Sequence, residues 1–202
     1  MSKTTVLAIV TAVLLSVPLV AQDTRDAANT EVKEFPAGGR VLIHMRAGDL
    51  KVIKGADPKH IVLRYSATRH HQDISASVEH RFDVWGDEAD IQLRAPTDNV
   101  EFSVEVEVPS PADLKVRMLA GDLTVDGVEG NKDIELHFGD LRIDRVRQAS
   151  YRRIDASTHA GDVGGFPGGT HGWIGQSGRL EGSGQYRLHA HVGAGDVHLD
   201  FE

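Results

Sequence analysis

The chain has 202 residues, with 22 Lys and Arg against 30 Asp and Glu, and its formal net charge is −8 at pH 7. An acidic chain without a basic cluster binds nucleic acid and anionic lipid poorly, so we expect neither as a partner. The absence of cysteine excludes disulfides and lipid attachment to a cysteine. Its 21 glycines are scattered rather than gathered into a linker, as expected of a chain with many turns.

The first 21 residues have the layout of a signal peptide. Lys3 provides a positive start, residues 6–15 are almost wholly apolar, and Ala21 is a small residue at the expected cut. The apolar run is short for a membrane span, although an uncleaved anchor is the alternative. We therefore expect export to the periplasm, the outer envelope surface or the extracellular space, not residence in the cytoplasm. Residues 22–33 predict a flexible leader, and residues 34–202 predict a single domain.

Hydrophobic and polar residues alternate through most of this domain. Residues 41–46, 74–84 and 100–108 show the two-residue period that is typical of half-buried strands. The same period in the second of these stretches places His80 on the inward face. No window beyond the signal peptide keeps a 3.6-residue period, so the sequence predicts an all-β domain.

The tripeptide Ala-Gly-Asp, followed by an aliphatic residue, recurs along the chain. Glycine adopts positive φ at little cost, and aspartate can hydrogen-bond the backbone two residues further on, so we interpret each copy as a tight corner between two strands. A weaker copy has Arg179 in place of the aspartate, and in another Phe138 replaces the alanine. The glycine and aspartate pairs of the corners are Gly48 and Asp49, Gly121 and Asp122, Gly139 and Asp140, Gly161 and Asp162, and Gly195 and Asp196.

The spacing of the corners predicts stacked β-arcs. From Asp122 onward the corners follow at intervals of 18, 22, 17 and 17 residues, enough for two short strands and two turns. One such unit cannot bury its apolar face alone, so the units must stack. We therefore predict a β-solenoid or β-roll of stacked arcs, with repeat coils mainly in residues 112–202, continuing from a longer-stranded N-terminal sheet region. The inward positions before the corners include Leu114, Val116, Met118, Ile134, Leu136, Phe138, Ile154, Ala156, Thr158, Tyr186, Leu188, Ala190 and Val192.

Several segments in order resemble a known family. A valine-rich strand ending at Pro109 leads to residues 112–116, then to the corner at 120–125 and to Gly127-Val128-Glu129-Gly130, and residues 35–39 match an opening segment. This set resembles the bacterial putative-adhesin β-strand-repeat family, domain of unknown function 4097, over about residues 34–202. The resemblance implies an exported or envelope-associated β-repeat protein of unsettled function. It supplies no functional residues to transfer.

The recurring aspartates raise the question of bound calcium. Calcium takes six to eight oxygen ligands, and stacked corner aspartates would form a ladder at the sheet spacing of about 4.8 Å. The chain lacks the tandem nine-residue repeats of toxin-type calcium sites, so we favour aspartates that shape turns.

Eleven histidines are many for a chain of this length. Counting back three residues from the corner aspartates places His137 and His159 side by side on the outer face, and His189 and His191 share that outward register. These four are candidate ligands of a transition metal. The alternative is ordinary surface histidines that gain charge in mildly acidic solution, and we expect no cofactor.

Glu101, Glu105 and Glu107 form an acidic strip on one strand face. Carboxylates two residues apart on a strand are separated by about 6.5–7 Å, which a glycosidase pair would allow. We favour a solvated face that pairs with Lys115 and Arg117 on a neighbouring strand, because nothing in the sequence identifies a groove. No Gly-x-Ser-x-Gly motif supports nucleophilic catalysis.

Trp85 and Trp173 lie beside glycines in expected loops, where an aromatic ring can stack on a sugar or close the end of a core. The sequence thus predicts a noncatalytic, exported β-repeat protein that acts as a cell-envelope or extracellular interaction or scaffold module, with envelope proteins or surface glycans as partners. Two alternatives stay open. One is a carbohydrate-active or metal-dependent enzyme on a β-helix-type scaffold, and the other is a solenoid that self-assembles into filaments.

Overall fold

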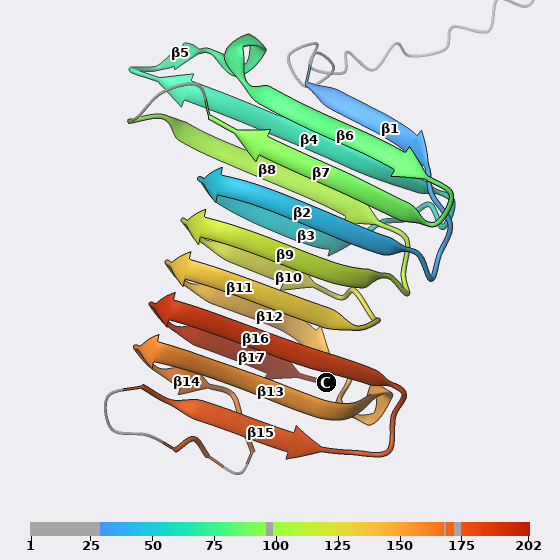
Figure 1. Ribbon diagram of the computed structural model, residues 1–202, viewed down its shortest axis with the longest axis vertical. Coiled ribbons are helices and arrows are strands. Elements are labelled where there is room, and N and C mark those ends of the chain that lie inside the picture. Colours follow the sequence, from blue (N-terminus) through green and yellow to red (C-terminus); the bar gives the residue numbers. More distant parts are fainter. Residues whose placement is uncertain (1–28, 96–98, 168, 172–174) are drawn as a thin grey trace, which may run out of the picture.

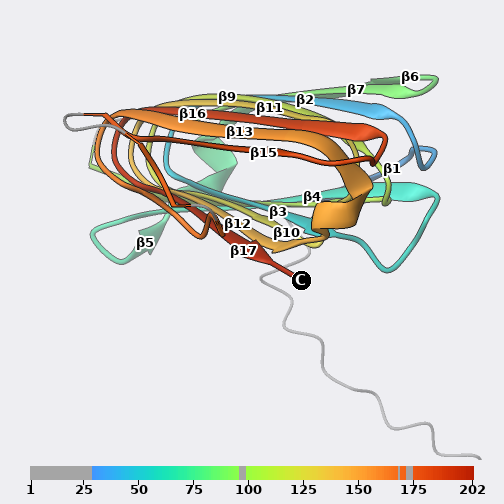
Figure 2. The ribbon, with the colours of Figure 1, turned by 90° about the horizontal axis from the view of Figure 1, so that it is seen from below.

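The computed structural model describes residues 29–95, 99–167, 169–171 and 175–202. These residues form two mixed β-sheets that lie face to face (Figures 1 and 2). Their only helical segments are two short 3-10 turns, Ser75–Ser77 and Gln148–Ser150. The prediction of an all-β domain is confirmed.

The predictions for the N-terminus concern residues that lie largely outside the described part of the chain. The expected signal peptide, residues 1–21, and most of the expected leader, residues 22–33, lie outside the described residues. The first described strand begins at Thr30, four residues before the expected start of the domain at Glu34. Within the described part of the chain there is no helix of the length and hydropathy that a membrane crossing requires.

Each sheet mixes parallel and antiparallel neighbours. In spatial order, the first sheet contains β1 (Thr30–Glu34), β4 (His60–Arg69), β8 (Glu101–Val108), β3 (Asp49–Lys54), β10 (Leu123–Asp126), β12 (Leu141–Val146), β17 (Val197–Phe201) and β14 (Val163–Gly164), and β5 (Gln72–Asp73) pairs with β4. The second sheet contains β15 (Ser177–Glu181), β13 (Tyr151–Ala160), β16 (Tyr186–Ala194), β11 (Lys132–Phe138), β9 (Asp113–Ala120), β2 (Arg40–Ala47), β7 (Glu88–Arg94) and β6 (Glu79–Trp85).

The five corners connect the two sheets. Each leads from a strand of the second sheet into a strand of the first: β2 into β3, β9 into β10, β11 into β12, β13 into β14 and β16 into β17. Neighbouring arcs run parallel and in matched register, so that Leu50, Leu123, Leu141 and Val197 lie in one row inside the core. The stacking of strand–corner–strand units is therefore present in the described chain.

The arcs do not stack in chain order. β16 lies between β11 and β13, and β17 between β12 and β14, so the last arc of the chain is inserted between two earlier ones. His137 on β11 and His159 on β13 are consequently separated by β16. The prediction that these two histidines lie side by side is wrong, because it assumed that successive arcs are neighbours.

The corner glycines have the backbone that the sequence predicted. Gly48, Gly121, Gly139, Gly161 and Gly195 all have positive φ, between +113° and +139°. They also lie against one another from arc to arc. A Cβ atom on Gly121 would lie 2.0 Å from the carbonyl oxygen of Gly48, and one on Gly139 would lie 2.1 Å from that of Gly121. Conformation and close approach both require glycine here.

The corner aspartates act differently from the prediction. Four of the five carboxylates accept a hydrogen bond from the backbone N–H of the aspartate in the next arc. The bonds to Oδ1 run from Asp122 N to Asp49 (3.5 Å), Asp140 N to Asp122 (3.2 Å), Asp196 N to Asp140 (2.9 Å) and Asp162 N to Asp196 (2.8 Å), and Gln176 Nε2 completes the row on Asp162 at 2.7 Å. This aspartate ladder ties the arcs together along the stack.

The predicted core is confirmed at most positions and wrong at Phe138. Its side chain lies at the corner of β11, where Ala120 and Ala194 occupy the same position in the neighbouring arcs, and 58% of it is exposed. The equivalent alanines are not buried either, so this corner position lies outside the core in the neighbouring arcs as well. The inward face of β11 instead carries Lys132, which is buried with only 3% exposed.

Both ends of the core are closed by aromatic residues. At one end Phe166, which is 8% exposed, packs its ring 6.0 Å from that of Phe201. At the other end Phe35 and Phe82 are buried, and Lys33 of β1 donates to the carbonyl oxygen of Phe82. The edges of the two sheets are therefore in contact at β1 and β6.

Candidate functional site

The four candidate histidine ligands all lie on the second sheet and do not form a metal site in the described chain. His137 is on β11, His159 on β13, and His189 and His191 are on β16. The Nδ1 atom of His191 lies 3.0 Å from the hydroxyl of Ser157. Among the described residues, no group of three or more His, Cys, Asp or Glu is arranged to hold a metal ion.

The glutamate strip lies on the first sheet and has other partners than predicted. Glu105 forms ion pairs with Lys51 Nζ at 3.4 Å and with Arg64 Nη1 at 3.3 Å. Arg64 also forms an ion pair with Glu107. The hydrogen bond to Glu107 raises the pKa of Arg64. The expected partners Lys115 and Arg117 belong to β9 in the opposite sheet, so that prediction is wrong.

His80 occupies an edge position and not a core position. It lies opposite the buried Leu93, on the inward side of β6, as predicted. However, β6 ends its sheet, and the segment before it is a 3-10 turn rather than strand, so the histidine keeps 29% of its side chain exposed. It contacts Glu31 of β1, with 2.5 Å between Nε2 and Oε1, and the hydroxyl of Tyr65 at 3.3 Å.

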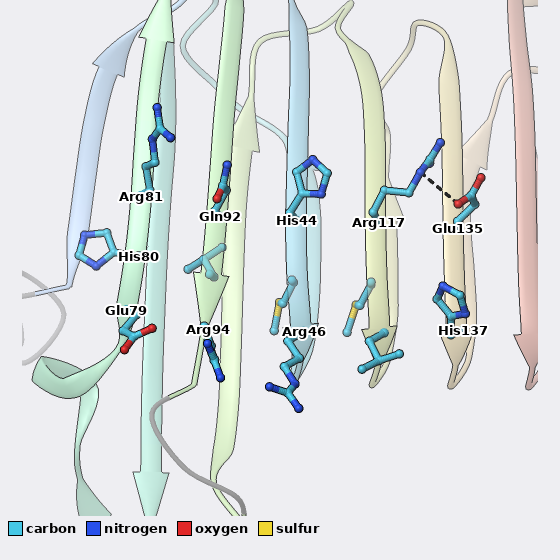
Figure 3. Close-up of a pocket in the computed structure, with 14 residues that line it drawn as sticks. His44, Arg46, Glu79, His80, Arg81, Gln92, Arg94, Arg117, Glu135 and His137 are labelled. Carbon is cyan, nitrogen blue, oxygen red and sulfur yellow. Dashed lines mark ion pairs between the residues drawn. The ribbon is translucent and has the colours of Figure 1, made fainter.

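The outer face of the second sheet contains a hollow of about 580 Å³, shown in Figure 3. It crosses β6, β7, β2, β9 and β11, from which polar side chains project while the alternate residues enter the core. We call it the Arg–His hollow. Its polar and charged lining residues are His44, Arg46, Glu79, His80, Arg81, Gln92, Arg94, Arg117, Glu135 and His137.

Two of the four arginines have acidic partners. Arg117 contacts Asp133 at 2.7 Å and Glu135 at 3.1 Å (dashed line to Glu135 in Figure 3). Arg81 contacts Asp83 at 2.5 Å, and this hydrogen bond raises the pKa of Arg81. These two cations are therefore largely neutralised by their neighbours.

Arg46 and Arg94 differ, because neither has an ion-pair partner among the described residues. They follow the paired residues Met45 and Leu93 on adjacent parallel strands, and Figure 3 shows them at the ends of these strands. Glu79 lies opposite Arg94 in the register of β6 and β7 but forms no ion pair with it in the described chain. Two cations thus lie next to each other at the rim of the hollow.

Trp85 lies on the same outer face, at the end of β6. It shares the outward phase of Arg81, whose guanidinium carbon lies 5.8 Å from the centre of the indole ring, and 54% of the tryptophan is exposed. It therefore does not close the core. Trp173, the second tryptophan singled out from the sequence, lies outside the described residues.

The sequence reasoning did not identify the arginines of the hollow. A local signal was present, since Arg46 and Arg117 occupy polar positions in alternating strands near a corner. Their proximity to Arg94 was not visible, because it depends on β2 lying between β7 and β9.

No protein-family model and no curated protein sequence matches this chain. Among solved structures, it is similar to a putative cell adhesion protein from Clostridium sporogenes, with a TM-score of 0.53 at 10% sequence identity, over 86% of this chain and 99% of that chain. It also aligns with a putative adhesin from Bacteroides fragilis, with a TM-score of 0.28 at 9% identity, over 84% and 95% of the two chains. The likeness to the first structure shows a shared fold.

Proposed function

We propose that the protein is an exported, noncatalytic, adhesin-like module that mediates contacts at the cell envelope or outside the cell. The observation that carries this proposal is the Arg–His hollow, a charged and open hollow on a broad sheet face. Its support from comparison is a fold shared with a protein named a putative cell adhesion protein. Under this proposal the chain is a member of the β-strand-repeat family named above, and its stack of arcs is a β-solenoid with one inserted arc.

Several features of the described chain favour binding over catalysis. The carboxylates of Asp122, Asp140 and Asp196 each accept a hydrogen bond from the backbone of a neighbouring arc. Glu105 of the glutamate strip lines a hollow on the first sheet, where it is paired with Lys51 and Arg64. Charged and polar side chains on an open surface give specificity to binding when they match opposite charges on a partner.

Export and binding are tested separately. Cell fractionation of the full-length chain should find a shortened protein in the periplasm or medium, whereas Leu14→Arg in the apolar run should retain it in the cytoplasm. The purified exported protein should then be retained on bacterial cells or on immobilised glycans. Absence of retention on every surface would contradict the adhesin-like role. Release of reducing ends from polysaccharide would favour the enzyme alternative, and growth of particles with concentration in sedimentation would favour the filament.

A further inference from the structure

We propose that the Arg–His hollow binds an acidic polysaccharide, a glycan that carries carboxylate or sulfate groups along its chain. This inference rests on the proposed function and specifies its ligand. It is carried by the charge of the hollow, by the pair of arginines at its rim, by the tryptophan beside it and by the strand pairing beneath it.

Within the described residues, the hollow carries positive charge at two unpaired arginines in an otherwise acidic chain. The chain carries a formal net charge of −8, yet the lining contains four arginines and only two glutamates. One of these glutamates, Glu135, is bound by Arg117. Asp83 and Asp133 neutralise Arg81 and Arg117 in the same way, so the positive charge of the hollow is concentrated at Arg46 and Arg94, where it can attract an anion.

The pair Arg46 and Arg94 indicates where an anionic group binds. Like charges on adjacent strands destabilise a sheet by up to about 1 kcal/mol, so two neighbouring arginines are an unfavourable arrangement for stability alone. A carboxylate or sulfate between the two guanidinium groups removes this repulsion. Arginine also binds such groups through two parallel hydrogen bonds, which gives geometric specificity.

The strands beneath the hollow favour recognition through side chains. Four of its five strands, β7, β2, β9 and β11, have a paired strand on both sides, so their backbone groups are already hydrogen-bonded, whereas β6 ends the sheet. A peptide therefore cannot add to them as a further strand, which is a common way for sheets to bind peptides. Leu119, which is 42% exposed, is the single large exposed hydrophobic residue of the described lining.

The remaining groups match a sugar chain. His44 and Gln92 lie side by side in register on β2 and β7, where they can exchange hydrogen bonds with hydroxyl groups. Trp85 presents a half-exposed ring on the same face and provides a flat apolar surface for a sugar ring. Five adjacent strands span four intervals of about 4.8 Å, or roughly 19 Å, so several sugar units can contact the hollow at once.

The test measures binding of the full exported protein to immobilised polysaccharides at low salt. The probes are polygalacturonate for carboxylates and dextran sulfate for sulfates, with neutral dextran and poly-glutamate as comparisons. The double variant R46Q/R94Q removes both unpaired cations. The matched control K54Q/R69Q removes two exposed cations from the first sheet. Circular dichroism and the urea midpoint establish that each variant is folded.

We expect at least one acidic polysaccharide to bind, with affinity that falls as salt is raised, because screening weakens contacts between charges. R46Q/R94Q should reduce this affinity by about tenfold or more, as expected for the loss of charge-assisted hydrogen bonds. The control variant should bind as the unmodified protein does. The Trp85→Ala variant should weaken binding to polysaccharide but not binding to poly-glutamate.

Three results would overturn the proposal: equal binding of neutral and acidic dextrans, equal loss in the control variant, or tighter binding of poly-glutamate than of either polysaccharide. The last result would assign the hollow to an acidic protein segment. Undiminished retention of R46Q/R94Q on bacterial cells would reject this hollow while leaving the adhesin-like role in place. If the unmodified protein is retained on no surface, both the adhesin-like role and the polysaccharide site are rejected.

Discussion

Replacing Lys132 with methionine should remove a pH dependence from the stability of the fold. Lys132 points into the core, where its neighbours on β9 and β16 are leucines. Its Nζ donates to the carbonyl oxygen of Gly130 at 3.3 Å and to the hydroxyl of Tyr151. Burial lowers the pKa of Lys132 from its ordinary value of 10.5 to about 7, an effect that the nearby carboxylate of Glu129 partly opposes.

The sign of the pH dependence follows from the two pKa values. Between about pH 7 and 10.5 the unfolded chain binds a proton at Lys132 that the folded protein has released. The free energy of unfolding therefore rises with pH across this window. Below it, both states are charged and the folded state carries the whole cost of burying the ammonium group. A fall from 10.5 to about 7 corresponds to an upper limit of about 5 kcal/mol.

The measurement is urea unfolding of the unmodified protein and of Lys132→Met at several values between about pH 6 and about pH 9.5. The variant should be more stable at the acidic end by several kcal/mol, about 1 kcal/mol less than the upper limit because Tyr151 loses a hydrogen-bond partner. This advantage should shrink as pH rises. Higher pH is avoided because burial raises the pKa of Tyr151, so the unfolded chain loses the phenol proton first and stability falls.

Lys54→Met, at the exposed end of β3, is the control, because it replaces a lysine that does not enter the core. The reasoning is refuted if the difference between Lys132→Met and the unmodified protein is the same at every pH. That result would mean that Lys132 keeps its proton on folding.

Three further changes test the corners and the end of the core by urea or thermal unfolding. Gly121→Ala should lower the free energy of unfolding by about 2–3 kcal/mol or more, since φ is +113° and the new Cβ would lie 2.0 Å from a carbonyl oxygen. The control Gly38→Ala has φ +86° but no atom within 4 Å of the new Cβ, so it should lower this free energy by about 1 kcal/mol. Asp140→Ala should lower the free energy of unfolding by about 1 kcal/mol and speed hydrogen exchange of the Asp196 amide, which loses its acceptor. Asp140→Asn keeps an acceptor oxygen and removes one of several neighbouring negative charges. Its stability should therefore be unchanged or higher at low salt. Phe166→Ala should cost about 3–5 kcal/mol, and a loss below about 1 kcal/mol would show that this ring does not close the core.

The local parts of the fold were predictable because they depend on neighbouring residues. The alternation of residues 100–108 indicated the strand β8, and the Gly-Asp pairs indicated the corners with positive φ. The order of the arcs was not predictable in the same way. Every arc carries the same pattern, so no local signal distinguishes a stack in chain order from one in which β16 and β17 are inserted.

The candidate site was less predictable than the fold for the same physical reason. Arg46 and Arg94 lie far apart in the sequence and become neighbours through the pairing of β2 with β7. The histidines were placed on the correct outer face, since that depends only on alternation within a strand. The prediction that His137 and His159 lie side by side was wrong, because it depends on which strands are adjacent.

The corners nevertheless supply a rule that relates the sequence to the face. The backbone bonds of the aspartate ladder hold the arcs in register, so residues at equal distance before a corner aspartate lie in one row across the second sheet. Five residues before each, this row reads His44, Arg117, Glu135, His191 and Ser157, and each neighbouring pair in it is a register pair in the structure. The stability of the stack depends on the corners and the inward residues, whereas these outward positions do not contribute to the core. Arg46, three residues before Asp49, lies in another outward row, so its replacement can change what the face binds while leaving the stack intact.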